Sequence, residues 1–77
     1  MKFIQVLGPG CPKCAKTEQI VRQAVAQSGV EAHVEKVSDL NMIAALGVFV
    51  TPGVLVDGQV KVSGRVPKAE EVVQWLQ

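Results

Sequence analysis

The sequence lacks long apolar runs, charged blocks and the ligand set of a zinc site. Its longest apolar stretches fall far short of the roughly 18 to 20 residues that cross a bilayer. Lys and Arg are scattered singly and the formal net charge is only +1, so the basic stripe that nucleic-acid backbones require is missing. Two cysteines and one histidine are too few for a four-ligand zinc site. We therefore expect no membrane, nucleic-acid or zinc role.

Seventy-seven residues suffice for one hydrophobic core, so we expect a single domain over residues 1–77. The N-terminus reaches polar Gln5 too early for a secretory signal, which predicts a cytoplasmic protein. The cytosol keeps ordinary thiols reduced, and a disulfide between Cys11 and Cys14 would close a loop too short to stabilise the fold. The two cysteines are therefore expected to be catalytic or to bind metal.

Hydrophobic spacing predicts seven elements along the chain. The helix over 12–28 is expected to end at Gly29, and the dipeptide Asp57-Gly58 is typical of a tight hairpin turn. We expect strands over 2–7, 30–35, 54–56 and 60–62, and helices over 12–28, over 40–46 after a cap at Ser38 or Asp39, and from the turn at Pro67 to the C-terminus with Ala69, Val72, Val73 and Leu76 on one face.

The Cys11-Pro12-Lys13-Cys14 motif stands where a strand gives way to a helix. Unpaired N–H groups and the positive end of the helix dipole stabilise a thiolate at Cys11. Pro12 fits the first helical position, and Lys13 adds a positive charge nearby. Cys14 follows one turn later, within disulfide range, and its side of the helix continues through Thr17, Val21 and Ala24. We therefore expect Cys11 to be the exposed nucleophile and Cys14 the inward-facing thiol that resolves a mixed disulfide.

A carrier of a soft metal is the alternative, because two thiolates alone hold Cu(I) and such carriers also begin with a strand, Cys-x-x-Cys and a helix. Those carriers normally end on a strand. Here the last element has helical spacing, and Val50-Thr51-Pro52-Gly53 precedes the third strand. These two features favour redox chemistry over metal transport, so we expect no metal at the site.

The chain resembles the thioredoxin and glutaredoxin superfamily, and in particular its small stand-alone redox-active disulfide proteins. The resemblance rests on residues 6–14, 47–58 and 64–67. It implies an α/β thioredoxin-like fold, in which a four-stranded mixed sheet of order 2-1-3-4 is flanked by three helices. It also implies a cis peptide bond at Pro52 beside the cysteines, with the backbone of Thr51 pairing with substrate and the proline ring keeping metal away.

The resemblance further implies a protein-disulfide oxidoreductase that needs no cofactor besides the redox-active Cys11-Cys14 disulfide. Its expected partners are disulfide-containing substrate proteins and a thiol reductant or reductase, and we expect a monomer. The sequence departs from the family at three places. No aromatic residue stands directly before Cys11, where the chain has Gly8-Pro9-Gly10 instead. Gln5 stands roughly where thioredoxins keep a buried carboxylate, and residues 64–66 do not match the glutathione-binding segment of glutaredoxins. The electron donor therefore stays open.

Overall fold

A computed structural model describes all 77 residues as one mixed sheet with three helices. The order of the strands in the sheet is β2-β1-β3-β4. β1 pairs with β2 in parallel and with β3 antiparallel, and β3 pairs antiparallel with β4. The α/β fold and the strand order expected from the resemblance are confirmed. The elements are β1 (Lys2–Leu7), α1 (Pro12–Ser28), β2 (Ala32–Val37), α2 (Leu40–Ala45), β3 (Gly53–Val56), β4 (Gln59–Ser63) and α3 (Ala69–Leu76).

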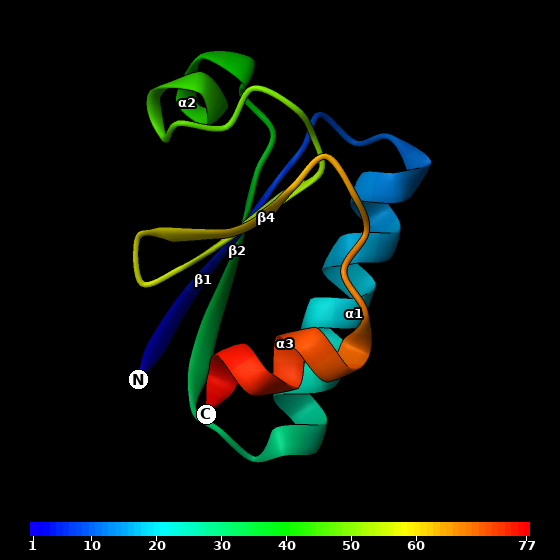
Figure 1. The fold of residues 1–77 in the computed structure, drawn as a ribbon, viewed down its shortest axis with the longest axis vertical. Coiled ribbons are helices and arrows are strands. Elements are labelled where there is room, and N and C mark those ends of the chain that lie inside the picture. Colours follow the sequence, from blue (N-terminus) through cyan, green and yellow to red (C-terminus); the bar gives the residue numbers. More distant parts are fainter.

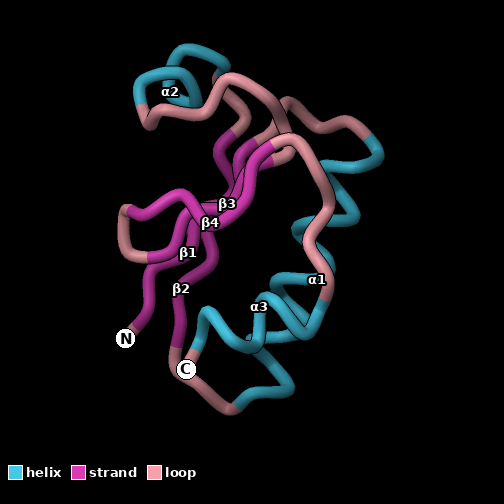
Figure 2. The backbone as a smooth tube through the Cα atoms, viewed as in Figure 1, coloured by secondary structure: helices cyan, strands magenta, loops and turns pink.

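The helices lie on different sides of the sheet (Figures 1 and 2). α1 and α3 pack together along one face of the sheet, whereas α2 lies near one end of it, away from the other two helices. This arrangement follows from the connections, because α1 joins the parallel strands β1 and β2 and such a crossover needs a helix across one face. The sheet therefore has two unequal faces.

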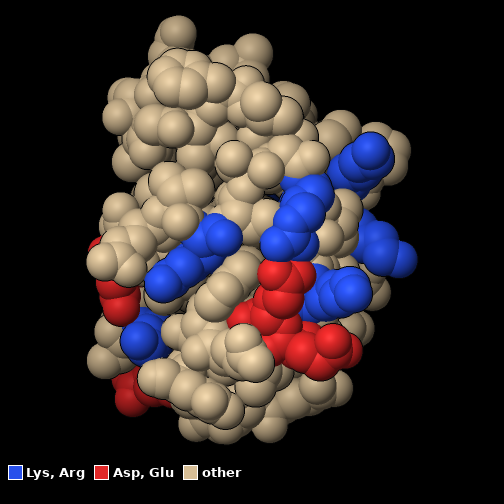
Figure 3. All heavy atoms as spheres, viewed as in Figure 1, with Lys and Arg blue, Asp and Glu red and all other residues tan.

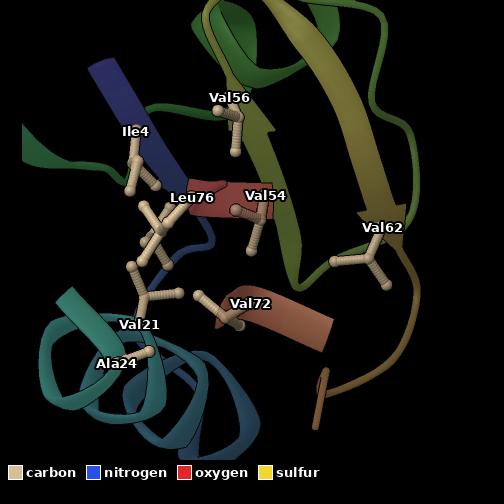
Figure 4. Close-up of a cluster of buried hydrophobic side chains, with 9 residues drawn as sticks. Ile4, Val21, Ala24, Val54, Val56, Val62, Val72 and Leu76 are labelled. Atoms are coloured by element: carbon tan, nitrogen blue, oxygen red, sulfur yellow. The ribbon is translucent and has the colours of Figure 1, made fainter. Parts of the chain in front are cut away.

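The larger core fills the space between the sheet and the helices α1 and α3 (Figure 4). Strand positions that alternate along β1 and β3 meet helix positions spaced three or four apart, as the sequence pattern predicts. Burial of this apolar surface is the main stabilising contribution to the fold. The nine buried residues are Ile4, Val6, Val21, Ala24, Val54, Val56, Val62, Val72 and Leu76.

A second, smaller core lies on the opposite face of the sheet, under α2. It consists of Leu7, Val37, Ile43, Val48 and Leu55, all buried. The Asp39 carboxylate begins α2 by accepting a hydrogen bond of 2.8 Å from the N–H of Asn41, as an N-cap does. This core attaches α2 and the segment that follows it to the sheet.

The second strand begins two residues later than expected, at Ala32 rather than Val30. Gly29 ends α1 in the left-handed conformation, with φ 71°. The N–H of Val30 then donates to the Ser28 hydroxyl at 3.1 Å, so Val30 belongs to the helix cap and not to the sheet. The strand instead continues to Val37, whose side chain enters the smaller core. The alternating pattern therefore predicted which residues of β2 face inward, but not where the strand begins and ends.

The helices α3 and α2 also differ in detail from the expectation. Pro67 precedes α3 instead of standing in its first turn, because Lys68 is the N-cap and its N–H donates to the Glu71 carboxylate at 2.9 Å. Ala69 and Leu40 are exposed although both were expected on apolar helix faces. In α2 only Ile43 is buried, since a helix of six residues is short and turns few of its positions toward the sheet.

Candidate active site

Sheet pairing places the cysteine motif and the Thr51-Pro52 segment at the same end of the molecule. The last residue of β1, Leu7, is the partner of Gly53, the first residue of β3. The loop that leaves β1 for the cysteines and the loop that enters β3 therefore start from neighbouring positions. The Thr51-Pro52 peptide bond is cis, as the resemblance implied. The Pro52 carbonyl accepts a hydrogen bond of 2.8 Å from the N–H of Gly64, which ties this loop to the end of β4.

Cys11 caps α1 with its own side chain. Its backbone is extended, with φ −68° and ψ 163°, and its sulfur accepts a hydrogen bond of 3.3 Å from the N–H of Cys14. This is the position and the pairing of an N-cap residue, which satisfies one of the free N–H groups of the first turn. Pro12 follows at the start of the helix, as expected. The half-buried sulfur of Cys11 thus lies at the positive end of α1.

Cys14 lies beneath this tip, and only 1% of its surface is exposed. It begins the buried row of α1, which continues through Thr17, Val21 and Ala24, as the sequence predicted. The Thr17 hydroxyl donates to the Lys13 carbonyl at 2.8 Å, so this buried polar group is already satisfied. The two thiols therefore differ in accessibility while belonging to the same helical turn.

The surroundings move the two thiol pKa values in opposite directions. Hydrogen bonding by the Cys14 side chain, followed by that of the Cys14 N–H, lowers the pKa of Cys11 below its ordinary value. Burial, followed by hydrogen bonding to Cys11, raises the pKa of Cys14. At a given pH the Cys11 thiol is therefore the more ionised of the pair, and the thiolate is the nucleophilic form.

Lys13 contributes to the site through its backbone. Its backbone N–H contributes to the lowered pKa of Cys11, whereas its side chain is exposed. Charge in solvent is screened over short distances, whereas the N–H is fixed by the helix. The helix backbone therefore adds to the effect of the Cys14 side chain in lowering the pKa of Cys11.

An uncharged surface adjoins the site, and the sequence reading overlooked it. No charged residue occurs over positions 40–56, and the upper end of Figure 3, over α2, carries no Lys, Arg, Asp or Glu on the visible face. Phe49 is 83% exposed. The absence of charged residues over positions 40–56 is the sequence signal that could have indicated this surface. The exposed apolar side chains of this surface are Leu40, Met42, Phe49 and Val50.

The one pocket of the molecule lies elsewhere, between α1 and β2. It is an open hollow of about 420 Å³ lined by Arg22, Val25, Ala26, Ala32, His33 and Val34, and it contains none of the expected site residues. Nowhere do three or more His, Cys, Asp or Glu side chains come together as potential metal ligands. None of the helices has the length and apolar character needed to cross a membrane.

Comparison with known proteins agrees with this geometry. The family model described as "Thioredoxin domain" matches residues 2–77. A protein named thioredoxin from Methanocaldococcus jannaschii is 43% identical over 76 residues, which cover 99% of this chain and 87% of the relative. A second thioredoxin, from Methanothermobacter thermautotrophicus, is 39% identical over 76 residues and 99% of both chains. This chain therefore belongs to the thioredoxin family.

Proposed function

We propose that the protein is a thiol-disulfide oxidoreductase that reduces protein disulfides through Cys11 and Cys14. The observation that carries the proposal is the asymmetry of the pair. Cys11 is accessible and its pKa is lowered, whereas Cys14 is buried and its pKa is raised. One sulfur is thus suited to attack a target and the other to act only after the target is attached.

The proposed reaction has two exchange steps. In the first, the Cys11 thiolate attacks one sulfur of the target disulfide, so that a mixed disulfide forms, the target S–S bond breaks, and the released target thiolate takes up a proton. In the second, Cys14 loses its proton and attacks the Cys11 sulfur. The Cys11-Cys14 disulfide then forms and the second target thiolate leaves and is protonated. Two electrons and two protons pass to the target, and a thiol reductant or reductase restores the dithiol. No bound cofactor takes part.

The choice of a protein as substrate is supported by the surroundings of the thiols. The N–H and C=O of Thr51 have no hydrogen-bond partner within the chain, so an extended peptide could pair with them as a strand pairs with a sheet edge. Thr51 and Pro52 are therefore proposed as substrate-binding residues. The exposed Phe49 and Val50 directly precede them, and an apolar surface of this kind is typical of contact with another protein.

Trapping of mixed disulfides tests the proposal. Cys14→Ser should leave Cys11 able to attack but remove the second step, so covalent complexes with a disulfide-containing protein should accumulate on non-reducing gels. Cys11→Ser is the matched control, because it makes the same sulfur-to-oxygen change at the other cysteine of the motif. This variant should trap nothing. Equal trapping by the two variants, or trapping by neither while the wild type reduces no protein disulfide, would contradict the proposed function.

A further inference from the structure

Gly8 lies directly against the buried thiol. It is the first residue after β1, it is buried, and its N–H donates to the Val37 carbonyl at 2.9 Å. This hydrogen bond extends the pairing of β1 with β2 by one residue and holds Gly8 at the end of β1, inside the sheet. α1 then brings Cys14 back over this point, since the chain makes only a short loop between Leu7 and Pro12.

The backbone of Gly8 does not itself require glycine. The positive φ angles of the chain belong to other glycines and to Asp57, with Gly10 at 100° in the same loop. A side chain at position 8 is instead excluded by space. A Cβ there would overlap the Cys14 sulfur and would lie 2.8 Å from the Cys14 Cβ, well inside the roughly 3.5 to 4.0 Å at which carbon atoms pack.

We propose that Gly8 is a positioning residue for Cys14, because the missing side chain at position 8 leaves the space in which the Cys14 sulfur rests under the tip of α1. This inference rests on the proposed function, in that Cys14 is taken as the resolving thiol. Rotation of the Cys14 side chain would not relieve an added Cβ, since the Cys14 Cβ is also too close. The first turn of α1 would have to move away from the sheet, and the sulfur of Cys14 would become exposed.

The first test is the order in which the thiols are alkylated across a range of pH in Gly8→Ala. The wild type should be modified first at Cys11, whereas the variant should lose this order because both sulfurs become accessible. Gly53→Ala is the matched control. A Cβ at position 53 would meet Val48 Cγ1 at 3.0 Å and no cysteine, so this variant should lower the melting temperature but keep the order of modification. A folded Gly8→Ala protein with the wild-type order would overturn the inference.

The second test covers the case in which Gly8→Ala does not fold. Cys14→Gly removes both close atoms, so the variant Gly8→Ala/Cys14→Gly transfers the small side chain from one side of the contact to the other. In a double-mutant cycle, Gly8→Ala should lower the melting temperature strongly in the wild type and little in the Cys14→Gly background. If Gly8→Ala unfolds the wild type, the double variant should fold. An equal loss in both backgrounds would overturn the inference.

Neither test requires a substrate. If the wild type fails to reduce protein disulfides but Gly8→Ala abolishes the order of alkylation, the proposed function falls and the role of Gly8 in placing Cys14 stands. If the wild type reduces disulfides, Gly8→Ala keeps the wild-type order of alkylation, and Gly8→Ala lowers the melting temperature equally in both backgrounds, the inference about Gly8 falls and the proposed function stands.

Discussion

Val48→Ala tests whether the smaller core positions Thr51 and Pro52, the proposed substrate-binding residues, independently of the cysteines. Val48 is 2% exposed, belongs to the core under α2, and lies against the backbone of Gly53, next to Pro52. The substitution removes two buried methyl groups, which costs about 1.6 kcal/mol at about 0.8 kcal/mol each. The space left behind raises the cost to about 2 to 3 kcal/mol.

This loss should leave a folded protein. A chain of this size has about 4 to 12 kcal/mol of stability in total, and each kcal/mol shifts the melting temperature of a small domain by about 4 to 8 °C. We therefore expect Val48→Ala to melt about 10 to 20 °C lower, as followed by circular dichroism. At room temperature the variant should exchange several-fold more slowly with a protein disulfide, because the backbone of Thr51 is less firmly held. Exchange with a small disulfide that does not contact Thr51 should be unchanged.

Val21→Ala is the matched control, because it deletes the same two methyl groups from a fully buried valine in the larger core. It should lower the melting temperature by a similar amount and leave the exchange with protein disulfides near the wild-type rate at room temperature. If the two variants slow protein exchange equally, the smaller core has no special part in positioning Thr51 and Pro52, and the reasoning is refuted.

Two further predictions concern titration. The Glu71 pKa is lowered from its ordinary 4.5 to about 2, first through the hydrogen bonds with Arg65. Its ionised form thus adds stability that is complete above about pH 4.5 and is lost as the pH falls toward 2. Thermal melts should show the difference between wild type and Glu71→Gln shrinking over that range, and a constant difference would contradict it. Second, the Cys14 side chain is the largest cause of the low Cys11 pKa, and Cys14→Ser keeps a hydrogen-bond donor there whereas Cys14→Ala does not. Alkylation rates against pH should therefore give a higher Cys11 pKa in Cys14→Ala than in Cys14→Ser. Equal pKa values in the two variants would contradict this.

Local patterns predicted much of the fold and the thiol pair. The burial of Cys14 followed from the helical row through Thr17 and Val21, because a period of 3.6 residues fixes which positions share a face. The hairpin followed from Asp57-Gly58, both of which have positive φ, as the turn requires. These features depend on neighbours in sequence, and neighbours in sequence can be read directly.

Sequence patterns could not predict features that depend on contacts between residues far apart in the sequence. The exposure of Phe49 depends on how α2 is placed against the sheet, and the shift of β2 to Val37 depends on its pairing with β1. The contact between Gly8 and Cys14 joins two elements across a loop, and no periodicity indicates it. Strand order and the cis bond at Pro52 were reached only through the resemblance to a family.

A titration of free thiols against defined thiol-disulfide buffers, repeated with Cu(I) and Zn(II), tests the central claim most directly. The account predicts that Cys11 and Cys14 lose their thiols together in one reversible two-electron transition, that mass spectrometry finds the disulfide within a single chain, and that neither metal is retained tightly. Stoichiometric capture of Cu(I) that prevents oxidation would instead identify a metal carrier, and oxidation that yields only disulfides between chains would contradict a redox couple formed by Cys11 and Cys14.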